Sequence, residues 1–216
     1  MTSQKAPRYI GIEGPIGVGK TSLAKILAQK FGARLIQEEV ANNPFLERFY
    51  DDRRKYAFQT QLYFLLSRYR QQRDLAQGDL FEKGLVSDYV LAKDKIFAYL
   101  NLEEDEISLY EMVYKLLVPT VPRPDLVIYL QARPEVLLAR IRKRGVEYER
   151  NISLDYLRLL SDAYNEYFFH YNETPLLVVN TSEIDFVESP RDLEHLVREV
   201  KSVKRGTQHY IPLGSR

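Results

Sequence analysis

The sequence predicts an α/β protein in which a five-stranded parallel sheet carries helices on both faces, and residues 1–216 are expected to form a single domain. Three observations support this fold. Short apolar runs alternate with longer stretches of helical pattern, the first run leads into a glycine-rich motif, and two runs end in acidic residues. The candidate strands are residues 9–12, 35–38, 85–88, 126–131 and 176–180. Such alternation is typical of parallel sheets, because helices make the crossover connections.

The first candidate strand is followed by a phosphate-binding loop. Residues 14–21 read Gly14-Pro15-Ile16-Gly17-Val18-Gly19-Lys20-Thr21 and match the pattern G-x-x-x-x-G-K-[ST] at every required position. A helical apolar pattern begins at residue 21, so the motif lies between a strand and a helix, as this loop requires. In such a loop backbone N–H groups surround a triphosphate, Lys20 adds a charge at the β- and γ-phosphates, and the Thr21 hydroxyl is a ligand for Mg²⁺. The motif therefore predicts the P-loop NTPase fold.

Three further helices follow from the pattern of apolar residues and breakers. A long helix is predicted over residues 56–78. Pro134 and Gly145 frame a helix over residues 135–144, because proline suits the first helical turn and glycine the position after the last. Ser153 is suited to cap another helix that runs to about residue 171. The basic tail at residues 201–216 is expected either to be flexible or to fold back near the nucleotide.

Composition narrows the classes of partner. The chain has 31 basic and 30 acidic residues and a formal charge of +1, so it lacks the electrostatic signature of a protein that binds a nucleic acid polymer. It has no cysteine, no apolar run long enough to span a bilayer and no signal segment before the first strand. We therefore expect a cytoplasmic protein without a membrane partner.

Two candidate strands deliver acids to the edge of the sheet where open α/β folds place their chemistry. Glu38 and Glu39 follow one apolar run, and Asp88 follows another. A kinase needs one carboxylate to deprotonate an attacking hydroxyl and another to hold Mg²⁺ opposite the P-loop hydroxyl. A solvated acid at the end of a strand is the alternative interpretation for each, and position alone does not separate the two.

The long helix over residues 56–78 contains a candidate site for a nucleobase. Gln61 and Arg68 lie seven residues apart and share a face, with Phe64 between them. An aromatic ring provides stacking, and a glutamine amide can pair bidentately with adenine. The alternative is an amphipathic surface helix whose polar side chains are solvated.

A cluster of basic residues ends the helix over residues 135–144. Arg140 and Arg144 lie at positions i and i+4, so both can reach one polyphosphate and neutralise the charge of the transferred group. A solvated basic helix end, placed favourably against the helix dipole, is the alternative interpretation.

Taken together, these pieces resemble the deoxynucleoside kinase family of deoxyadenosine, deoxyguanosine and deoxycytidine kinases, from residue 9 to about residue 180. Their order and spacing agree as a set, which is more specific than any single motif. In chain order the matching pieces are the loop at residues 14–21, Glu38-Glu39-Val40 where the family usually has Glu-Pro-Val, Asn43-Pro44-Phe45-Leu46 with Phe49-Tyr50, Phe58-Gln59-Thr60-Gln61, Leu66-Ser67-Arg68, and the lid Arg140-Ile141-Arg142-Lys143-Arg144-Gly145.

The resemblance implies a role for each of these positions. It implies an ATP-dependent kinase that phosphorylates the 5′-hydroxyl of a deoxynucleoside, more often a purine one, and that forms a homodimer packed through helices. The implied base is Glu38, chosen over Glu39 because it stands two residues before Val40. The other implied residues are Lys20, Arg140 and Arg144 for phosphates, Thr21 and Asp88 for Mg²⁺, Tyr50 and Glu149 for the sugar 3′-hydroxyl, Gln61 beside Phe64 for the base, and Arg68 with Asp94 for its exocyclic groups. The lid is expected at about residues 140–150.

One departure from the family pattern follows the third candidate strand. The family usually has Asp/Glu-Arg-Ser where this chain has Asp88-Tyr89-Val90. Either Lys93, Lys95 or a lid arginine compensates for the missing arginine, or the activity is weakened. A thymidylate-kinase-like nucleotide kinase and a catalytically weak nucleotide-binding or structural member of the family stay open as alternatives. A regulatory GTPase is disfavoured, because the guanine-reading motif Asn-Lys-x-Asp is absent from the sequence.

Overall fold

The computed structural model describes residues 9–76, 84–91, 93–117 and 121–212. A six-stranded sheet forms its centre, in the order β2-β3-β1-β4-β5-β6, and every pair of neighbouring strands is parallel. The strands are β1 (Tyr9–Glu13), β2 (Arg34–Ile36), β3 (Leu85–Ser87), β4 (Leu126–Gln131), β5 (Leu176–Asn180) and β6 (Thr207–Tyr210). The predicted parallel α/β sheet is confirmed, whereas the predicted number of five strands is wrong.

The additional strand, β6, lies at the edge of the sheet beside β5. Its sequence, Thr-Gln-His-Tyr, has no apolar run, and its side chains are exposed or only half-buried. Backbone pairing with β5, which joins Leu176 to Thr207 and Val179 to Tyr210, defines this strand. Part of the tail that we expected to be flexible or folded back therefore extends the sheet, while residues 213–216 lie outside the described residues.

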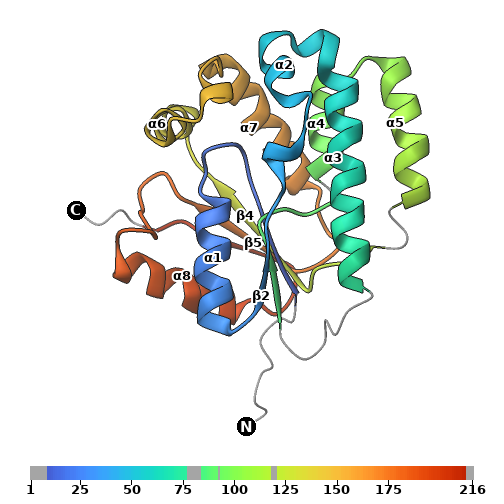
Figure 1. The fold of residues 1–216 in the computed structure, drawn as a ribbon. Helices are drawn as coiled ribbons and strands as arrows, with labels where there is room; N and C mark the ends of the chain where they lie inside the picture. Colours follow the sequence, from blue (N-terminus) through green and yellow to red (C-terminus); the bar gives the residue numbers. More distant parts are fainter. Residues whose placement is uncertain (1–8, 77–83, 92, 118–120, 213–216) are drawn as a thin grey trace.

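Helices cover both faces of the sheet, as predicted. The helices are α1 (Lys20–Phe31), α2 (Leu46–Asp51), α3 (Arg53–Ala76), α4 (Lys93–Asn101), α5 (Glu104–Leu117), α6 (Pro134–Arg144), α7 (Leu154–Phe169) and α8 (Pro190–Ser202), with 3₁₀ turns η1 (Val40–Asn42) and η3 (Glu147–Glu149). Figure 1 shows α1 and α8 on one side of the sheet and α3, α4, α5 and α7 on the other. Within the described residues, no helix is both long and apolar enough to cross a membrane.

The sequence signals for helix ends act as expected. Pro134 occupies the first turn of α6, and Gly145 ends it with a φ of 68°. The Ser153 hydroxyl accepts a hydrogen bond of 3.2 Å from the Tyr156 backbone N–H and so caps α7. The predicted long helix is α3, which begins earlier than expected, at Arg53. Residues 77 and 78 of that prediction lie outside the described residues.

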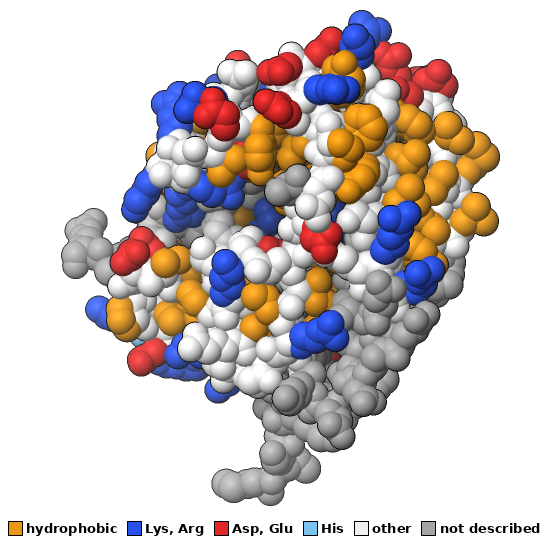
Figure 2. Space-filling model, in the orientation of Figure 1, with side chains coloured by type: hydrophobic (Ala, Val, Ile, Leu, Met, Phe, Trp, Pro, Cys, Tyr) orange, Lys and Arg blue, Asp and Glu red, His pale blue; other side chains and the backbone are white. Residues whose placement is uncertain are grey.

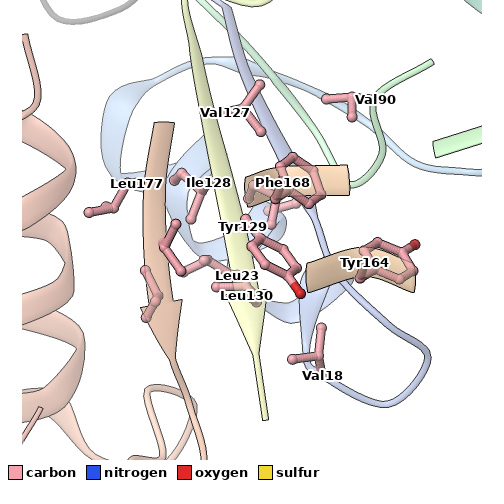
Figure 3. Close-up of a cluster of buried hydrophobic side chains, with 14 of the residues drawn as sticks. Val18, Leu23, Val90, Val127, Ile128, Tyr129, Leu130, Tyr164, Phe168 and Leu177 are labelled. Carbon is pink, nitrogen blue, oxygen red and sulfur yellow. The ribbon is translucent and has the colours of Figure 1, made fainter. Parts of the chain in front are cut away.

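The main core joins the central strands to helices on both faces. β1 is buried along its whole length, and β4 is buried except at its last residue. Figure 3 shows Tyr129 of β4 projecting towards Phe168 and Tyr164 of α7; its ring stacks on that of Phe168 with centroids 4.2 Å apart. Burial of such large side chains stabilises the sheet by roughly 2–3 kcal/mol each. The strands that support the functional loops are therefore rigidly held.

The strand order brings the predicted functional segments to one edge of the sheet. β2, β3 and β1 are neighbours, and all three run in the same direction. The P-loop follows β1, Asp88 follows β3, and Glu38 lies two residues beyond the end of β2. Because parallel strands present their carboxyl ends together, these three segments converge on one site.

Candidate active site

The P-loop has the backbone geometry that its glycines predict. Gly17 and Gly19 have φ values of 84° and 105°, which L residues with a Cβ rarely adopt. A Cβ on Gly17 would lie 2.8 Å from the carbonyl oxygen of Leu137, so the space is also closed to a side chain. Gly19 immediately precedes α1, whose N-terminus therefore points its free N–H groups into the loop.

Lys20 reaches back over the loop that precedes it. Its Nζ donates hydrogen bonds to the carbonyl oxygens of Gly14, at 2.7 Å, and Pro15, at 3.1 Å. Burial and the nearby charge of Lys93 lower the pKa of Lys20 to about 8. An anionic phosphate would offset both effects, so the loop holds a cation that is poised for a phosphate ligand.

Thr21 and Asp88 bring oxygen ligands together below the loop. The Thr21 hydroxyl donates to Asp88 Oδ2 at 2.6 Å, and Asp88 Oδ1 accepts a hydrogen bond of 2.7 Å from the Glu38 backbone N–H. A hydroxyl and a carboxylate beside a phosphate-binding loop are the hard oxygen ligands that Mg²⁺ uses, with phosphates and water completing its shell. The two side chains fit the predicted Mg²⁺ site, and Asp88 also positions Glu38.

Glu38 is held between two cations. Its side chain is 9% exposed; Oε1 accepts a hydrogen bond of 2.8 Å from Arg68 Nε, and Oε2 accepts one of 2.7 Å from Lys93 Nζ. Burial alone would raise the pKa of Glu38, but the charges of Arg68 and Lys93 hold it well below its usual range. The carboxylate is therefore ionised and fixed in orientation, so Glu38 is not a solvated acid at a strand end.

Arg68 also pairs with a second buried acid, Asp94, which is fully inaccessible to solvent. Gln61 Nε2 donates to Asp94 Oδ1 and to the Asp94 carbonyl oxygen, both at 3.0 Å. Burial raises the pKa of Asp94 to about 6, although the charge of Arg68 opposes this shift. Gln61 and Arg68 are only 5% and 3% exposed, so the alternative of a solvated surface helix is wrong.

These side chains line a cavity of about 180 Å³ next to the P-loop, which we call the acceptor cavity. Arg144 reaches its rim and donates to Glu149 Oε1 at 2.6 Å. Tyr50 forms part of an aromatic wall and stacks on Tyr148 with centroids 6.1 Å apart. The cavity is lined by Ile16, Gly17, Lys20, Thr21, Gln37, Glu38, Val40, Leu46, Phe49, Tyr50, Thr60, Gln61, Phe64, Arg68, Asp88, Lys93, Phe97, Arg144 and Glu149.

A larger cavity of about 450 Å³, the donor cavity, lies on the other side of the P-loop. Its walls are residues 17–22 of the loop and α1, the basic residues Arg140, Lys143 and Arg144 of α6, and residues 184–188. Figure 2 shows Lys and Arg side chains around the hollow between α6 and α1. Arg140 donates to Thr181 Oγ1 at 3.0 Å and to the Thr181 carbonyl oxygen at 2.8 Å, so its guanidinium is tied to the protein itself.

The structure brings together most of the residues that the sequence singled out. The acceptor cavity contains every predicted substrate-binding residue except Asp94, which lies behind Arg68 and Gln61. The sequence presents Lys93 only as one of several alternatives, and it does not identify Glu13. Glu13 accepts hydrogen bonds of 3.0 Å from the backbone N–H groups of Gly14 and Val90. The position of Glu13 directly before the P-loop is the signal that could have identified it.

A P-loop beside a cavity that is lined by an ionised carboxylate, other charged groups and apolar side chains is the arrangement of a small-molecule kinase. The model of the family described as "Deoxynucleoside kinase" matches residues 10–204 of this chain. The chain therefore belongs to the deoxynucleoside kinase family, and the resemblance found in its sequence is confirmed.

Individual relatives agree with the family. Deoxyguanosine kinase of Bacillus subtilis is 38% identical over 201 residues, which cover 90% of this chain and 97% of the relative. Deoxyadenosine kinase of Dictyostelium discoideum is 36% identical, over 88% of this chain and 78% of the relative. The solved structure of deoxyadenosine kinase from M. mycoides with bound dCTP superposes with a TM-score of 0.77 at 27% identity, and the match covers 90% of this chain and 99% of that one.

Proposed function

We propose that this kinase transfers the γ-phosphoryl group of ATP to the 5′-hydroxyl of a deoxynucleoside, with deoxyadenosine or deoxyguanosine preferred, in nucleotide salvage. The observation that carries the proposal is the ion-paired Glu38, which shares the acceptor cavity with Lys20 of the P-loop. The names of the relatives, deoxyguanosine kinase and deoxyadenosine kinase, support the purine preference. A chain without cysteine that consumes ATP suits the cytoplasm.

Glu38 is the proposed general base. As the 5′-oxygen bonds to the γ-phosphorus, its proton moves to a Glu38 carboxylate oxygen, and the bond between the γ-phosphorus and the bridging oxygen of ADP breaks. A carboxylate of low pKa is a weak base, so the proton is expected to move late, once bonding to phosphorus has made the hydroxyl acidic. Bound Mg²⁺, which Thr21 and Asp88 would hold, would neutralise charge on the β- and γ-phosphate oxygens.

Tyr50 and Glu149 are the proposed partners of the sugar 3′-hydroxyl. Burial, together with the nearby Tyr156 and Glu149, raises the pKa of Tyr50 well above its usual value, so its phenol stays protonated. A phenol donor beside a carboxylate acceptor suits a hydroxyl, which can accept from one and donate to the other. Glu149 already accepts from Arg144, so sugar binding is coupled to the lid.

Gln61 and Arg68 are the proposed readers of the base, with Phe64 as the aromatic surface beside them. The Arg68 guanidinium carbon lies 4.8 Å from the centre of the Phe64 ring. Both hydrogen bonds of Gln61 Nε2 go to Asp94, so the side-chain oxygen is the group that Gln61 offers to a base. That oxygen accepts from an exocyclic amino group, which both purines carry.

The test is a measurement of ADP release with each of the four deoxynucleosides and, separately, with thymidine monophosphate as acceptor. We expect turnover with deoxyadenosine or deoxyguanosine to exceed turnover with thymidine. A preference for the monophosphate would favour the nucleotide kinase alternative. Absence of turnover with every acceptor would favour the alternative of a catalytically weak nucleotide-binding or structural member of the family, and would overturn the proposal.

We also propose a homodimer packed through α3 and α5. Leu109, Met112 and Leu116 form a stripe on α5 and are 46%, 58% and 78% exposed. Leu66 of α3 is 36% exposed, and Figure 2 shows hydrophobic side chains gathered on this side of the molecule. A contiguous apolar surface of this kind is typical of an interface. Sedimentation of the wild-type chain and of Leu116→Glu tests this proposal. We expect the wild-type chain to be a dimer and Leu116→Glu to dissociate more readily, and a monomeric wild-type chain would contradict the proposal.

A further inference from the structure

The family arginine that normally follows the acid after the third strand is replaced by Tyr89, and Tyr89 cannot supply its charge. Its side chain is fully buried in a small cluster with Tyr9, Ile36 and Leu85. The Tyr89 hydroxyl donates to Gln71 Oε1 at 2.9 Å. The phenol therefore has a structural partner, and a cation for the reacting groups must come from elsewhere.

Lys93 is the nearest other cation on the same segment. It begins α4 and lines the acceptor cavity together with Lys20 and Thr21. Its side chain is 7% exposed, and its Nζ lies 2.7 Å from Glu38 Oε2. Lys93 and Lys20 therefore line the same cavity, the one in which the phosphoryl group is transferred under the proposed function.

The other candidate cations are committed elsewhere. The Nζ of Lys95 lies 4.8 Å from the centre of the Tyr114 ring. Lys95 lines a separate pocket, together with Tyr9 and Arg123. Arg140 is bound to Thr181, and Arg144 to Glu149. Arg68 is shared between Glu38 and Asp94, two acids for one cation. Lys93 has Glu38 as its acidic partner, and an ammonium group carries three donors, so it has capacity for a further anion.

We propose that Lys93 is a catalytic residue, which replaces the family arginine by donating one hydrogen bond to Glu38 and another to the transferred phosphoryl group. The inference rests on the proposed function, because it assigns Lys93 a place in that reaction. When the 5′-hydroxyl proton moves to Glu38, the carboxyl group becomes neutral and its attraction for Lys93 falls. The ammonium charge is then available to the oxygens of the phosphoryl group at the moment when charge spreads over them.

The first experiment compares Lys93→Met, Lys93→Arg and the matched control Lys95→Met. For Lys93→Met we expect kcat to fall about a hundredfold or more, with deoxynucleoside and ATP affinities, measured by calorimetry, within about threefold of the parent. Lys93→Arg should recover most of this loss, and Lys95→Met should leave turnover unchanged. The acid limb of the pH profile should move to higher pH in Lys93→Met, because Glu38 loses one of its two cations.

A second comparison, of Glu38→Gln with Glu38→Gln/Lys93→Met, separates direct action on the phosphoryl group from action through Glu38, and the double variant removes both members of the buried pair together. In a Glu38→Gln background the amide no longer needs an ionic partner, so added Lys93→Met is expected to fold. If Lys93 contacts the phosphoryl group, this second change should lower kcat by a further tenfold or so. No further loss would reduce Lys93 to a positioning residue for Glu38 and overturn the inference.

Other outcomes decide the matter as well. Turnover of Lys93→Met within about threefold of an active parent overturns the inference and leaves the proposed function intact. An equal loss of kcat in Lys93→Arg and Lys93→Met would also overturn it, because the positive charge that Arg retains would then contribute nothing to kcat. A parent without kinase activity would overturn the proposed function and the role of Lys93 with it.

Discussion

The two cavities on either side of the P-loop are built from different chemical groups. The acceptor cavity is formed by buried ion pairs: the side chains of Arg68, Glu38 and Asp94 are 4%, 9% and 0% exposed. The donor cavity is larger, and its loop contributes backbone N–H groups at the start of α1, with Lys143 and Arg144 as basic side chains on its wall. Backbone groups bind any polyphosphate, whereas fixed side chains distinguish one acceptor from another. Selectivity is therefore expected on the acceptor side.

The buried pairs also make the acceptor side the more fragile one. Charges taken out of water are tolerated only when partners and hydrogen bonds compensate them, and removal of one partner costs about 3–5 kcal/mol. Glu38, Arg68, Lys93 and Asp94 compensate one another, two acids against two bases. On the donor side Lys143 and Arg144 of α6 are exposed to solvent, so their loss should affect binding more than folding.

The largest effect should come from the group that serves both cavities. Lys20 lines each of them, and its replacement by Ala removes the charge that we propose acts on the β- and γ-phosphates. We expect Lys20→Ala to abolish nearly all turnover, measured as ADP release. The exposed Lys25 on the same helix is a matched control, and Lys25→Ala should leave turnover unchanged. Activity of Lys20→Ala within about threefold of the parent, under 1 kcal/mol of barrier, would show that the loop assignment is wrong.

The next largest effect should test Glu38 as the general base. Glu38→Gln should lower kcat by roughly a hundredfold or more while deoxynucleoside binding persists, because the amide keeps the shape but cannot take the proton. Glu39 is the control: it is exposed, and its Oε2 accepts a hydrogen bond of 2.9 Å from Asn42, so Glu39→Gln should change kcat little. Steady-state kinetics of both variants give the ranking. The reverse ranking would assign the base to Glu39.

The sequence was sufficient for the parts of this site that backbone geometry dictates. The backbone of the P-loop needs positive φ values at Gly17 and Gly19, which glycine adopts easily. This requirement appears in the sequence as a glycine motif, so the P-loop could be recognised without the structure. The shared face of Gln61 and Arg68 on α3 was visible in the sequence, but the resemblance to the family was needed to assign them to an acceptor site. A helix carries its spacing in the sequence, so the local pattern gives the shared face but not whether that face is buried.

Contacts between distant segments were not readable in the same way. Lys93 approaches Glu38 across 55 positions of the chain, and only the packing of α4 decides that Lys93, and not Lys95, makes this contact. β6 escaped prediction because its side chains are polar and partly exposed, and pairing with β5 gives no signal in the sequence of β6 itself. The predicted five strands were those with apolar runs, whereas an edge strand needs none.

A smaller effect should test the selectivity of the acceptor side. Gln61→Ala removes the proposed partner of the base and should leave polar edges of the bound base unpaired, which lowers kcat/KM for the deoxynucleoside by the equivalent of roughly 1–3 kcal/mol. ATP affinity should not change, because the donor cavity does not include Gln61. Gln59 is exposed on the same helix, and Gln59→Ala is the matched control. Unchanged deoxynucleoside affinity in Gln61→Ala, measured by calorimetry, would exclude this residue from base recognition.

The smallest effect is a protonation change on the donor side. The pKa of Lys20 is lowered to about 8 in the free protein, so at pH 8 about half of the molecules carry a neutral amine there. A bound triphosphate favours the charged form and raises that pKa, so ATP binding should take up about half a proton at pH 8 and almost none at pH 6.5. ATP affinity should accordingly weaken as the pH rises through 8, since each molecule must first be protonated. Calorimetry in two buffers of different ionisation enthalpy measures the uptake directly, with Lys20→Arg as the control that stays charged and takes up no proton. Release of protons at pH 8, or the same uptake in Lys20→Arg, would show that a group other than Lys20 titrates. The donor cavity would then depend on a second ionisable side chain as well as on the backbone N–H groups of its loop, and would differ less from the acceptor cavity.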